Sequence, residues 1–393
     1  MSEVRVNNLS NENSSGGPTI SGITTFSVTD YIIPPSGDTA SRPSGCPPGS
    51  IRFNTDSAHL EYYRGDTIGW VDIEASSEHL GLDAHTITGQ TGLGTRGIYF
   101  GGTGAPSTNR IDFFVTSTLG VTRDFGDAAV SATNRGPVSS RTRGIAMGGQ
   151  PGQSPYYINN IEFITIPQTG NGTDFGDSTQ LAGSAADACS NQIRGIRACG
   201  GGQSGGYINV IEYITIAQTG NALDFGDLSS ARGTTCQAIA NTVRGIFAGG
   251  YLPSPVVNII EFVTIMTTGN TTDFGDLTQT TRRAGAAYNA TRGIYAGGAT
   301  PSYTNVISFI TTATTGNATE FGDLIQNAQK PNCVSSPTRG VFCGGYGPGV
   351  PSPGAINVMQ FVEIATLGNS KDFGDLPAAD GAGCPISNGH GGL

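Results

Sequence analysis

The sequence predicts an all-β protein dominated by a six-bladed β-propeller, and three observations support this fold class. Residues 95–393 repeat one pattern six times: an Arg-Gly step, an apolar strand, a Gly-Gly doublet, a variable loop, a second strand and an Asp-Phe-Gly-Asp-like segment. The arginines that open the repeats are 47, 51, 50, 48 and 47 residues apart. The chain also ends on a partial repeat. One repeat of this length suits one four-stranded blade.

Turn chemistry divides each repeat into four expected strands, a to d. Strand b is the Arg-Gly-Ile-x-Ala segment, strand c the alternating Ile-x-Phe-x-Thr run, and strand d the Asp-Phe-Gly-Asp segment. Thr-Gly-Asn turns join c to d in most repeats, and Gly and Asn there tolerate the positive φ of tight hairpins. Strand a comes last, as in residues 284–289. This arrangement is typical of kelch-like propellers.

The partial repeat at the C-terminus predicts how the ring closes. Residues 382–391 overlay residues 284–293 position for position, so the chain ends with a strand a that lacks its own strand b. We expect segment 382–390 to pair with residues 96–101 and complete the first blade, which removes an exposed sheet edge. Residues 85–94 compete for the same place, and seven blades are therefore the alternative.

The N-terminal quarter of the chain differs from the repeats. Residues 1–30 are rich in Asn, Ser and Gly and predict an extended arm with a short β-prone run. Residues 31–76 predict a small β module, with strands at 50–55, 60–63 and 69–73 and turns around the prolines that precede them. Residues 77–94 are the predicted linker, and residues 95–393 are the propeller.

Composition limits the classes of partner. The net charge is −10, which argues against nucleic acid or an anionic membrane as the main partner. The sequence has no run of about 18 apolar residues, so no transmembrane helix is expected. The first residues lack a signal-peptide core. Seven cysteines without a secretory signal favour free thiols. Cys189/Cys199 and Cys333/Cys343 nevertheless flank equivalent turns, and whether either pair is bonded is left open.

The repeated charged residues predict structural roles. Asp-Phe-Gly resembles the magnesium motif of kinases, but its recurrence once per repeat indicates architecture: the Phe packs between sheets and the Gly permits a bulge. The opening arginines and the second aspartates of these segments suggest ion pairs that lock the blades, with arginine-to-carbonyl bonds as the alternative and metal binding by the aspartates as a lesser one. Arg283 is expected to be an exposed comparator. The repeat positions are Arg96, Arg143, Arg194, Arg244, Arg292, Arg339, Asp127, Asp177, Asp227, Asp276, Asp323 and Asp375.

Catalytic motifs are not evident in the sequence. The four histidines (His59, His79, His85 and His390) all lie outside complete repeats, and copper oxidases built on propellers need imidazole ligands. No nucleophile elbow, His-Glu-x-x-His motif or phosphate loop occurs. We therefore expect no enzymatic activity, no catalytic residues, no metal and no cofactor. A propeller hydrolase or oxidase stays as a third hypothesis.

The loops between strands b and c vary most from repeat to repeat, and most carry tyrosine. Variable aromatic loops on a rigid scaffold suit recognition of a ligand. The candidate ligand-binding residues are Tyr156, Tyr157, Tyr207, Tyr251, Tyr303 and Tyr346.

Several segments resemble structural proteins of tailed bacteriophages, particularly those that infect marine cyanobacteria. The segments that carry this resemblance are 6–11, 20–26, 42–44, 49–56, 61–65, 69–71 and 315–324. The resemblance implies a virion location, in a tail, fibre, baseplate or capsid decoration, with the N-terminal region docked on the particle.

We therefore expect a non-enzymatic virion surface protein that contacts other virion proteins, and its own copies, through the arm and module. The alternative is a host-attachment protein that binds a cell-surface carbohydrate or receptor through the tyrosine loops. Deleting residues 1–30 is expected to leave a folded propeller that no longer joins the particle.

Overall fold

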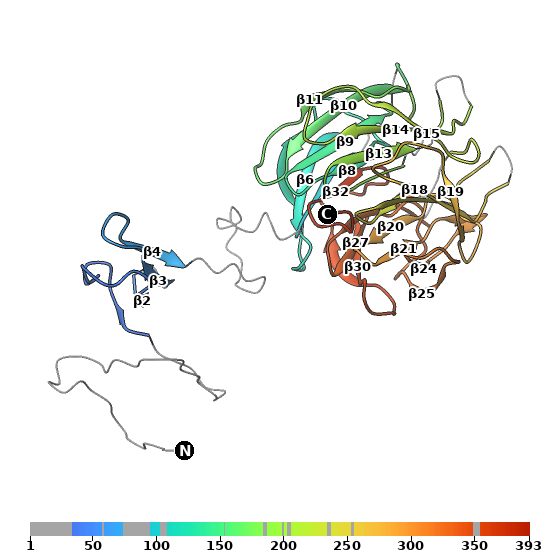
Figure 1. Ribbon diagram of the computed structural model, residues 1–393. Coiled ribbons are helices and arrows are strands. Elements are labelled where there is room, and N and C mark those ends of the chain that lie inside the picture. Colours follow the sequence, from blue (N-terminus) through green and yellow to red (C-terminus); the bar gives the residue numbers. More distant parts are fainter. Residues whose placement is uncertain are drawn as a thin grey trace. The chain divides into compact units, whose positions relative to one another are not determined.

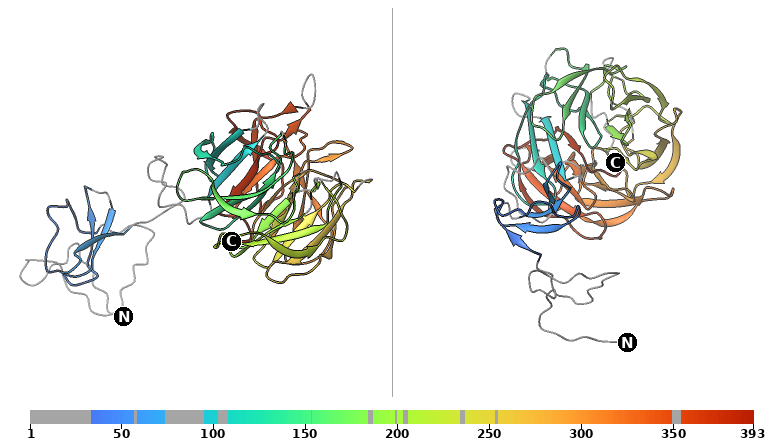
Figure 2. Two further views of the ribbon diagram at one scale, coloured as in Figure 1. Left: turned by 90° about the horizontal axis from the view of Figure 1, so that it is seen from above. Right: turned by 60° about the vertical axis from the view of Figure 1, so that its left-hand side comes forward.

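The computed structural model shows an all-β protein, as predicted, in two compact units (Figures 1 and 2). One unit spans Met1–Ser77 and the other Glu78–Leu393. The predicted arm (1–30) and linker (77–94) lie outside the described residues. Those are 34–56, 59–73, 95–102, 108–152, 154–183, 187–198, 200–202, 206–233, 237–252, 255–348 and 354–393.

The N-terminal unit contains a four-stranded sheet. Its strands, in order across the sheet, are β1 (Ser36–Gly37), β2 (Ile51–Asn54), β3 (His59–Tyr63) and β4 (Trp70–Ile73). Strands β2 to β4 form the predicted meander. Strand β1 was predicted as a turn and is instead a short strand parallel to β2. The prolines before it prevent a longer strand because they cannot donate ladder hydrogen bonds.

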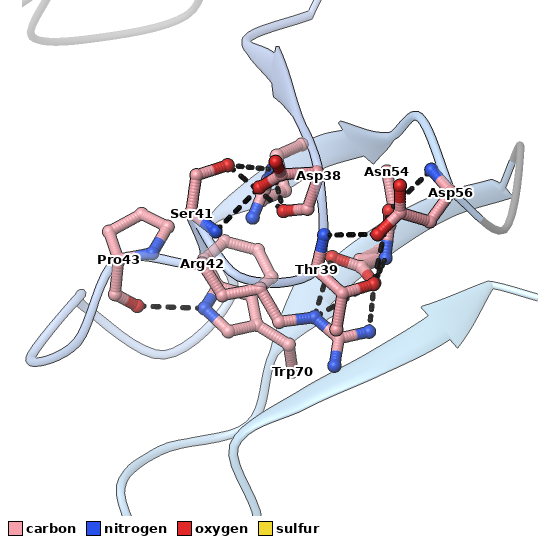
Figure 3. Close-up of polar contacts among 10 residues, drawn as sticks. Asp38, Thr39, Ser41, Arg42, Pro43, Asn54, Asp56 and Trp70 are labelled. Carbon is pink, nitrogen blue, oxygen red and sulfur yellow. Dashed lines mark hydrogen bonds and ion pairs between the residues drawn. The ribbon is translucent and has the colours of Figure 1, made fainter.

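One face of this small sheet is held by polar contacts (Figure 3). Glu61 is buried and accepts hydrogen bonds from Arg42 Nε, at 3.1 Å, and Asn54 Nδ2, at 2.6 Å. Trp70 Nε1 donates to the Pro43 carbonyl oxygen at 2.8 Å. On the opposite face, Ile51 and Leu60 are 53% and 41% exposed. The unit therefore buries polar residues under its own loop and leaves apolar side chains in solvent.

The described residues of the second unit form six four-stranded antiparallel sheets. Sheet I consists of β32 (Cys384–Ser387), β5 (Arg96–Gly102), β6 (Thr108–Val115) and β7 (Arg123–Asp127). Sheet II consists of β8 (Gly136–Ser139), β9 (Arg143–Gly149), β10 (Ile158–Thr165) and β11 (Thr173–Asp177). Sheet III consists of β12 (Asp187–Ser190), β13 (Arg194–Ala198), β14 (Val210–Thr215) and β15 (Leu223–Asp227).

The remaining sheets repeat the same order. Sheet IV consists of β16 (Ile239–Ala240), β17 (Arg244–Ala248), β18 (Ile259–Thr264) and β19 (Thr272–Asp276). Sheet V consists of β20 (Gly285–Tyr288), β21 (Arg292–Ala296), β24 (Val306–Thr311) and β25 (Thr319–Asp323). Sheet VI consists of β26 (Asn332–Ser335), β27 (Arg339–Cys343), β30 (Val358–Glu363) and β31 (Lys371–Asp375). Short hairpins β22/β23 (Ala299–Thr300, Ser302–Tyr303) and β28/β29 (Tyr346–Gly347, Gly354–Ala355) extend two loops.

The first strands of the six sheets lie next to one another around a centre. Strands β8, β12, β16, β20, β26 and β32 each contact the next, and β32 contacts β8. Figure 1 shows the sheets arranged around this centre, with the C-terminus inside it. Strand β32 pairs with β5 in antiparallel register, with Ile386 opposite Ile98. The all-β arrangement is thus propeller-like, and the hydrophobic core lies between adjacent sheets.

The Asp-Phe-Gly segments have the structural role that the repeat predicted. Phe175 is 2% exposed and packs edge-to-face against Phe163 of the neighbouring strand. The ladder register shifts opposite this segment, which marks a bulge. Gly126 has φ +146°, and a Cβ there would lie 2.5 Å from the Gly170 carbonyl oxygen of the next sheet. Only glycine lets the two backbones approach this closely.

The opening arginines do not pair with the aspartates, so the predicted ion-pair lock is wrong and the alternative of arginine-to-carbonyl bonds is correct. Arg143, for example, lies 4.4 Å from the Phe163 ring centroid and donates to the Ile216 carbonyl oxygen of the next sheet at 2.8 Å. Five other opening arginines also stack on an aromatic ring of the sheet to which they belong: Arg96, Arg194, Arg244, Arg292 and Arg339. Each of these arginines also donates a hydrogen bond to a backbone carbonyl oxygen of the following sheet.

The second aspartates instead act through their backbone. The Asp127 amide donates to Asn171 Oδ1 in the turn of the next sheet at 3.0 Å, and the Gly172 amide donates to the Asp127 carbonyl oxygen. Equivalent amide-to-Asn bonds involve Asp177, Asp227, Asp276 and Asp323. Their carboxylates are exposed or half-buried. Each outer strand is therefore covered by the neighbouring turn, which protects its edge from other chains.

Candidate binding face around the central channel

The predicted tyrosines share one end of the sheets, where strand b leads into strand c. Tyr156 is 67% exposed, whereas Tyr157, Tyr207, Tyr251, Tyr303 and Tyr346 are half-buried. The structure thus places one candidate in solvent and packs the other five into the face.

Contacts to adjacent sheets explain this burial. The rings of Tyr207 and Tyr251 meet edge-to-face with centroids 6.0 Å apart. The Arg282 guanidinium lies 5.2 Å from the Tyr251 centroid, and Gln329 Nε2 donates to Tyr303 Oη at 2.9 Å. These tyrosines shape a rigid surface, because their rings are fixed by neighbours from other sheets.

A narrow channel opens at this end of the inner strands. Its cavity of about 30 Å³ is lined by residues from all six sheets, among them Asn134, Asp187, Gln237, Arg283 and Lys330. A water needs about 10–15 Å³ by the same measure, so the cavity holds about two or three waters or a group of that size. Polar and charged residues share this lining with Pro137, Pro331 and Pro385.

Three buried arginine–glutamate pairs occur in sheets II, III and IV, and one of the arginines, Arg135, also lines the cavity. The pairs are Arg135–Glu162, Arg197–Glu212 and Arg232–Glu261. Each glutamate also accepts a backbone amide from the preceding sheet, as Thr179 donates to Glu212 at 2.7 Å. Arg197 holds the pKa of Glu212 below its usual value against the opposing effect of burial. Sequence reasoning missed these pairs, because the arginines occupy different positions in their repeats.

Three residues with unusual backbone conformations stand at the mouth itself. Asn134, Arg283 and Lys330 have φ values of 59°, 56° and 54°, a region that non-glycine residues rarely adopt. Lys330 Nζ donates to Asn134 Oδ1. Burial, with Arg283 nearby, lowers the Lys330 pKa to about 8. Arg283 was expected to be exposed; it is instead half-buried, because its strand begins at the channel.

The opposite end of the channel is filled by the C-terminal residues. Serine hydroxyls connect consecutive inner strands: Ser190 donates to the Ser139 carbonyl oxygen at 2.8 Å, and Ser139 to that of Ser387 at 2.7 Å. His390 lies beside them, 3.3 Å from Ser190 Oγ, and accepts the Gly392 amide at Nδ1. Burial lowers the pKa of His390 to about 4.

The cysteines that the structure describes are free thiols. Cys189, Cys333 and Cys343 are buried and unbonded. Burial raises the Cys189 pKa to about 12. Cys199 lies outside the described residues.

The described ranges hold neither a metal-binding cluster nor a helix that could span a membrane. No three His, Cys, Asp or Glu side chains there come close enough to hold a metal ion. Nor does a helix there have the length and hydrophobicity needed to span a bilayer. No family model matches the chain, and a search of curated proteins finds no significant match.

Proposed function

We propose that the second unit is a closed, six-bladed, kelch-like propeller that serves as a rigid framework for the variable b–c loops. Support comes from the cycle of inner-strand contacts and from the pairing of β32 with β5. At all six sheet boundaries, an arginine stacks on an aromatic ring of its own sheet and donates to a carbonyl oxygen of the next sheet. This includes the boundary from sheet VI back to sheet I. A ring locked in this way does not depend on a partner to fold.

This propeller is the outward part of a non-enzymatic virion surface protein, located in a tail, a fibre or the capsid decoration. The observation that carries the proposal is that each repeat contains two kinds of segment, one constant and one variable. The residues that join the sheets recur at every boundary, whereas the b–c loops differ and gather on one face. Rigid frameworks with variable loops are typical of recognition scaffolds. The virion assignment itself comes from the resemblance of the sequence segments to phage structural proteins.

The N-terminal unit supplies the attachment to other virion proteins or sister subunits. Its sheet buries a polar network on one side and presents Ile51 and Leu60 to solvent on the other. A sheet of this size needs apolar cover to be stable. A virion protein at this face provides that cover.

Deletion of residues 1–30 tests the proposal. The truncated protein is expected to remain folded, with circular dichroism and a melting temperature close to those of the full chain. It is also expected to be missing from particles assembled in infected cells, as measured by mass spectrometry of purified virions. Normal copy number of the truncated protein would place the docking surface on the propeller. Absence of the full-length chain from virions would refute the virion role.

A second function, attachment to a host-surface carbohydrate or receptor, is favoured by the tyrosines that gather where strand b leads into strand c. The half-buried rings of Tyr207, Tyr251 and Tyr303 are held by contacts to neighbouring residues, at the end of a channel that charged residues line in part, so a ligand would meet a pre-organised surface. Binding of the purified propeller to host cells, and its loss in a Tyr207→Ala variant, tests this role. A hydrolase or oxidase is less well supported, because the buried glutamates of sheets II, III and IV are each paired with an arginine.

A further inference from the structure

Basic side chains gather at the channel mouth of a protein whose net charge is −10. Arg135 in the cavity lining is neutralised by the buried Glu162. Arg282, Arg283 and Lys330 remain, and the acidic groups that face Lys330 are Asp187 and Asp380. Burial raises the Asp187 pKa well above its ordinary value, which disfavours its charged form. The mouth thus has an excess of positive charge.

Arg283 is the centre of this region. Its guanidinium lines the cavity and has no hydrogen-bond or ion-pair partner among the described residues. The hydroxyls of Tyr207, Tyr303 and Tyr346, from three different sheets, lie within its electrostatic reach. A half-buried guanidinium without an acceptor has lost part of its hydration, so an anionic ligand would restore its missing contacts.

We propose that the channel mouth binds an oxyanion, either a carboxylate or a phosphate, carried by a saccharide, with Arg283 as its main partner. The cavity of about 30 Å³ admits such a group and no sugar ring. The ring would therefore lie outside, against the fixed tyrosines. The planar guanidinium suits this task because it binds carboxylate and phosphate in bidentate geometry. Lys330 adds a second charge. This inference rests on the recognition role proposed for the face and names its ligand class.

Isothermal titration of the full chain with three probes tests the inference. Glucuronate carries the carboxylate, glucose 6-phosphate carries the phosphate, and glucose is the neutral reference. We expect at least one anionic probe to bind, while glucose does not. Arg283→Gln is expected to weaken that binding at least tenfold, and Lys330→Gln by a smaller factor.

Arg123→Gln is the matched control, because Arg123 is exposed on the outer strand β7. It should bind as the unchanged protein does. Thermal unfolding of each variant identifies any loss that is due to misfolding, and Lys330→Gln keeps the test available if Arg283→Gln does not fold.

Comparison of glucuronate with glucose 6-phosphate distinguishes the two oxyanions. Equal binding of all three sugars, no binding of either anion at millimolar concentrations, or unchanged affinity in folded Arg283→Gln would each overturn the inference. None of these outcomes bears on the presence of the chain in virions, so failure of this site can be told apart from failure of the virion role.

Discussion

Arg339, in the last complete repeat, donates a hydrogen bond of 3.0 Å to the carbonyl oxygen of Ser117, which lies 222 residues earlier in the first repeat. The same guanidinium lies 4.6 Å from the ring centroid of Phe361 in its own sheet. Five other arginines make equivalent bonds to the sheet that follows theirs in sequence. Arg339 makes the bond that returns to the first repeat, so the same contact joins each sheet to the next and also joins sheet VI to sheet I.

Arg244→Ala is expected to lower the free energy of unfolding by about 2 kcal/mol. The change removes the stack on Phe262 and the 2.8 Å bond to the Ala313 carbonyl oxygen in sheet V. A charged hydrogen bond contributes about 1.5–3 kcal/mol and a cation–π contact about 0.5–1 kcal/mol, and solvent partly replaces both at this half-buried site. Chemical denaturation, with exposed Arg123→Ala as control, measures the difference. Equal effects of the two variants would contradict a stabilising role for the contacts of Arg244.

Val121→Asn is expected to stabilise the boundary between sheets VI and I by about 0.5–1 kcal/mol. At the five other boundaries an Asn in the turn accepts an Asp amide of the preceding sheet, as Asn369 accepts that of Asp323 at 3.0 Å. Val121 stands at the equivalent position and is 68% exposed. A neutral hydrogen bond has about this value. The matched reverse variant, Asn369→Val, should lose a similar amount. Destabilisation by Val121→Asn would show that the two boundaries differ in backbone geometry.

Gly275→Ala is expected to destabilise the protein by about 1–3 kcal/mol more than Gly220→Ala. Both glycines have positive φ, at 146° and 156°, so both substitutions strain the backbone. A Cβ at Gly275 would also lie 2.5 Å from the Gly316 carbonyl oxygen, whereas a Cβ at Gly220 meets open space. Overpacking accounts for the extra cost. Melting curves of the two variants provide the measurement, and equal values would remove the close approach as the reason for glycine.

His390→Asn is expected to reduce the loss of stability in acid. Folded His390 stays neutral down to about pH 4, because burial disfavours its charge and its Nδ1 already accepts the Gly392 amide. The unfolded chain takes up this proton near pH 6.5. Between these values the unfolded state binds more protons, so stability falls as pH decreases, by roughly 3 kcal/mol in all.

Denaturation at pH 7, 5.5 and 4 measures this loss. The variant should show a smaller decrease than the unchanged protein, and His59→Asn, at an exposed position in the N-terminal unit, should show the full decrease. A full decrease in His390→Asn would mean that acid acts through other groups.

The sequence alone determined the strands of each repeat and their order. The Arg-Gly step begins strand b at Arg143, and the Asp-Phe-Gly segment forms strand d at Thr173–Asp177, because turn residues and alternating apolar positions are local signals. The role of the phenylalanines and glycines in these segments also followed from their recurrence. Strand β1 was missed because two residues after two prolines carry no strand pattern.

Tertiary structure decided which groups meet. Repetition showed that Arg143 matters, but only the approach of sheet III showed that its partner is the carbonyl oxygen of Ile216 and not an aspartate. The buried pairs Arg135–Glu162 and Arg197–Glu212 could not be predicted, since arginines from different repeat positions reach equivalent glutamates. Arg283 looked like an exposed residue for the same reason. A side chain's partners depend on which backbones come together in space, and sequence spacing alone does not record that.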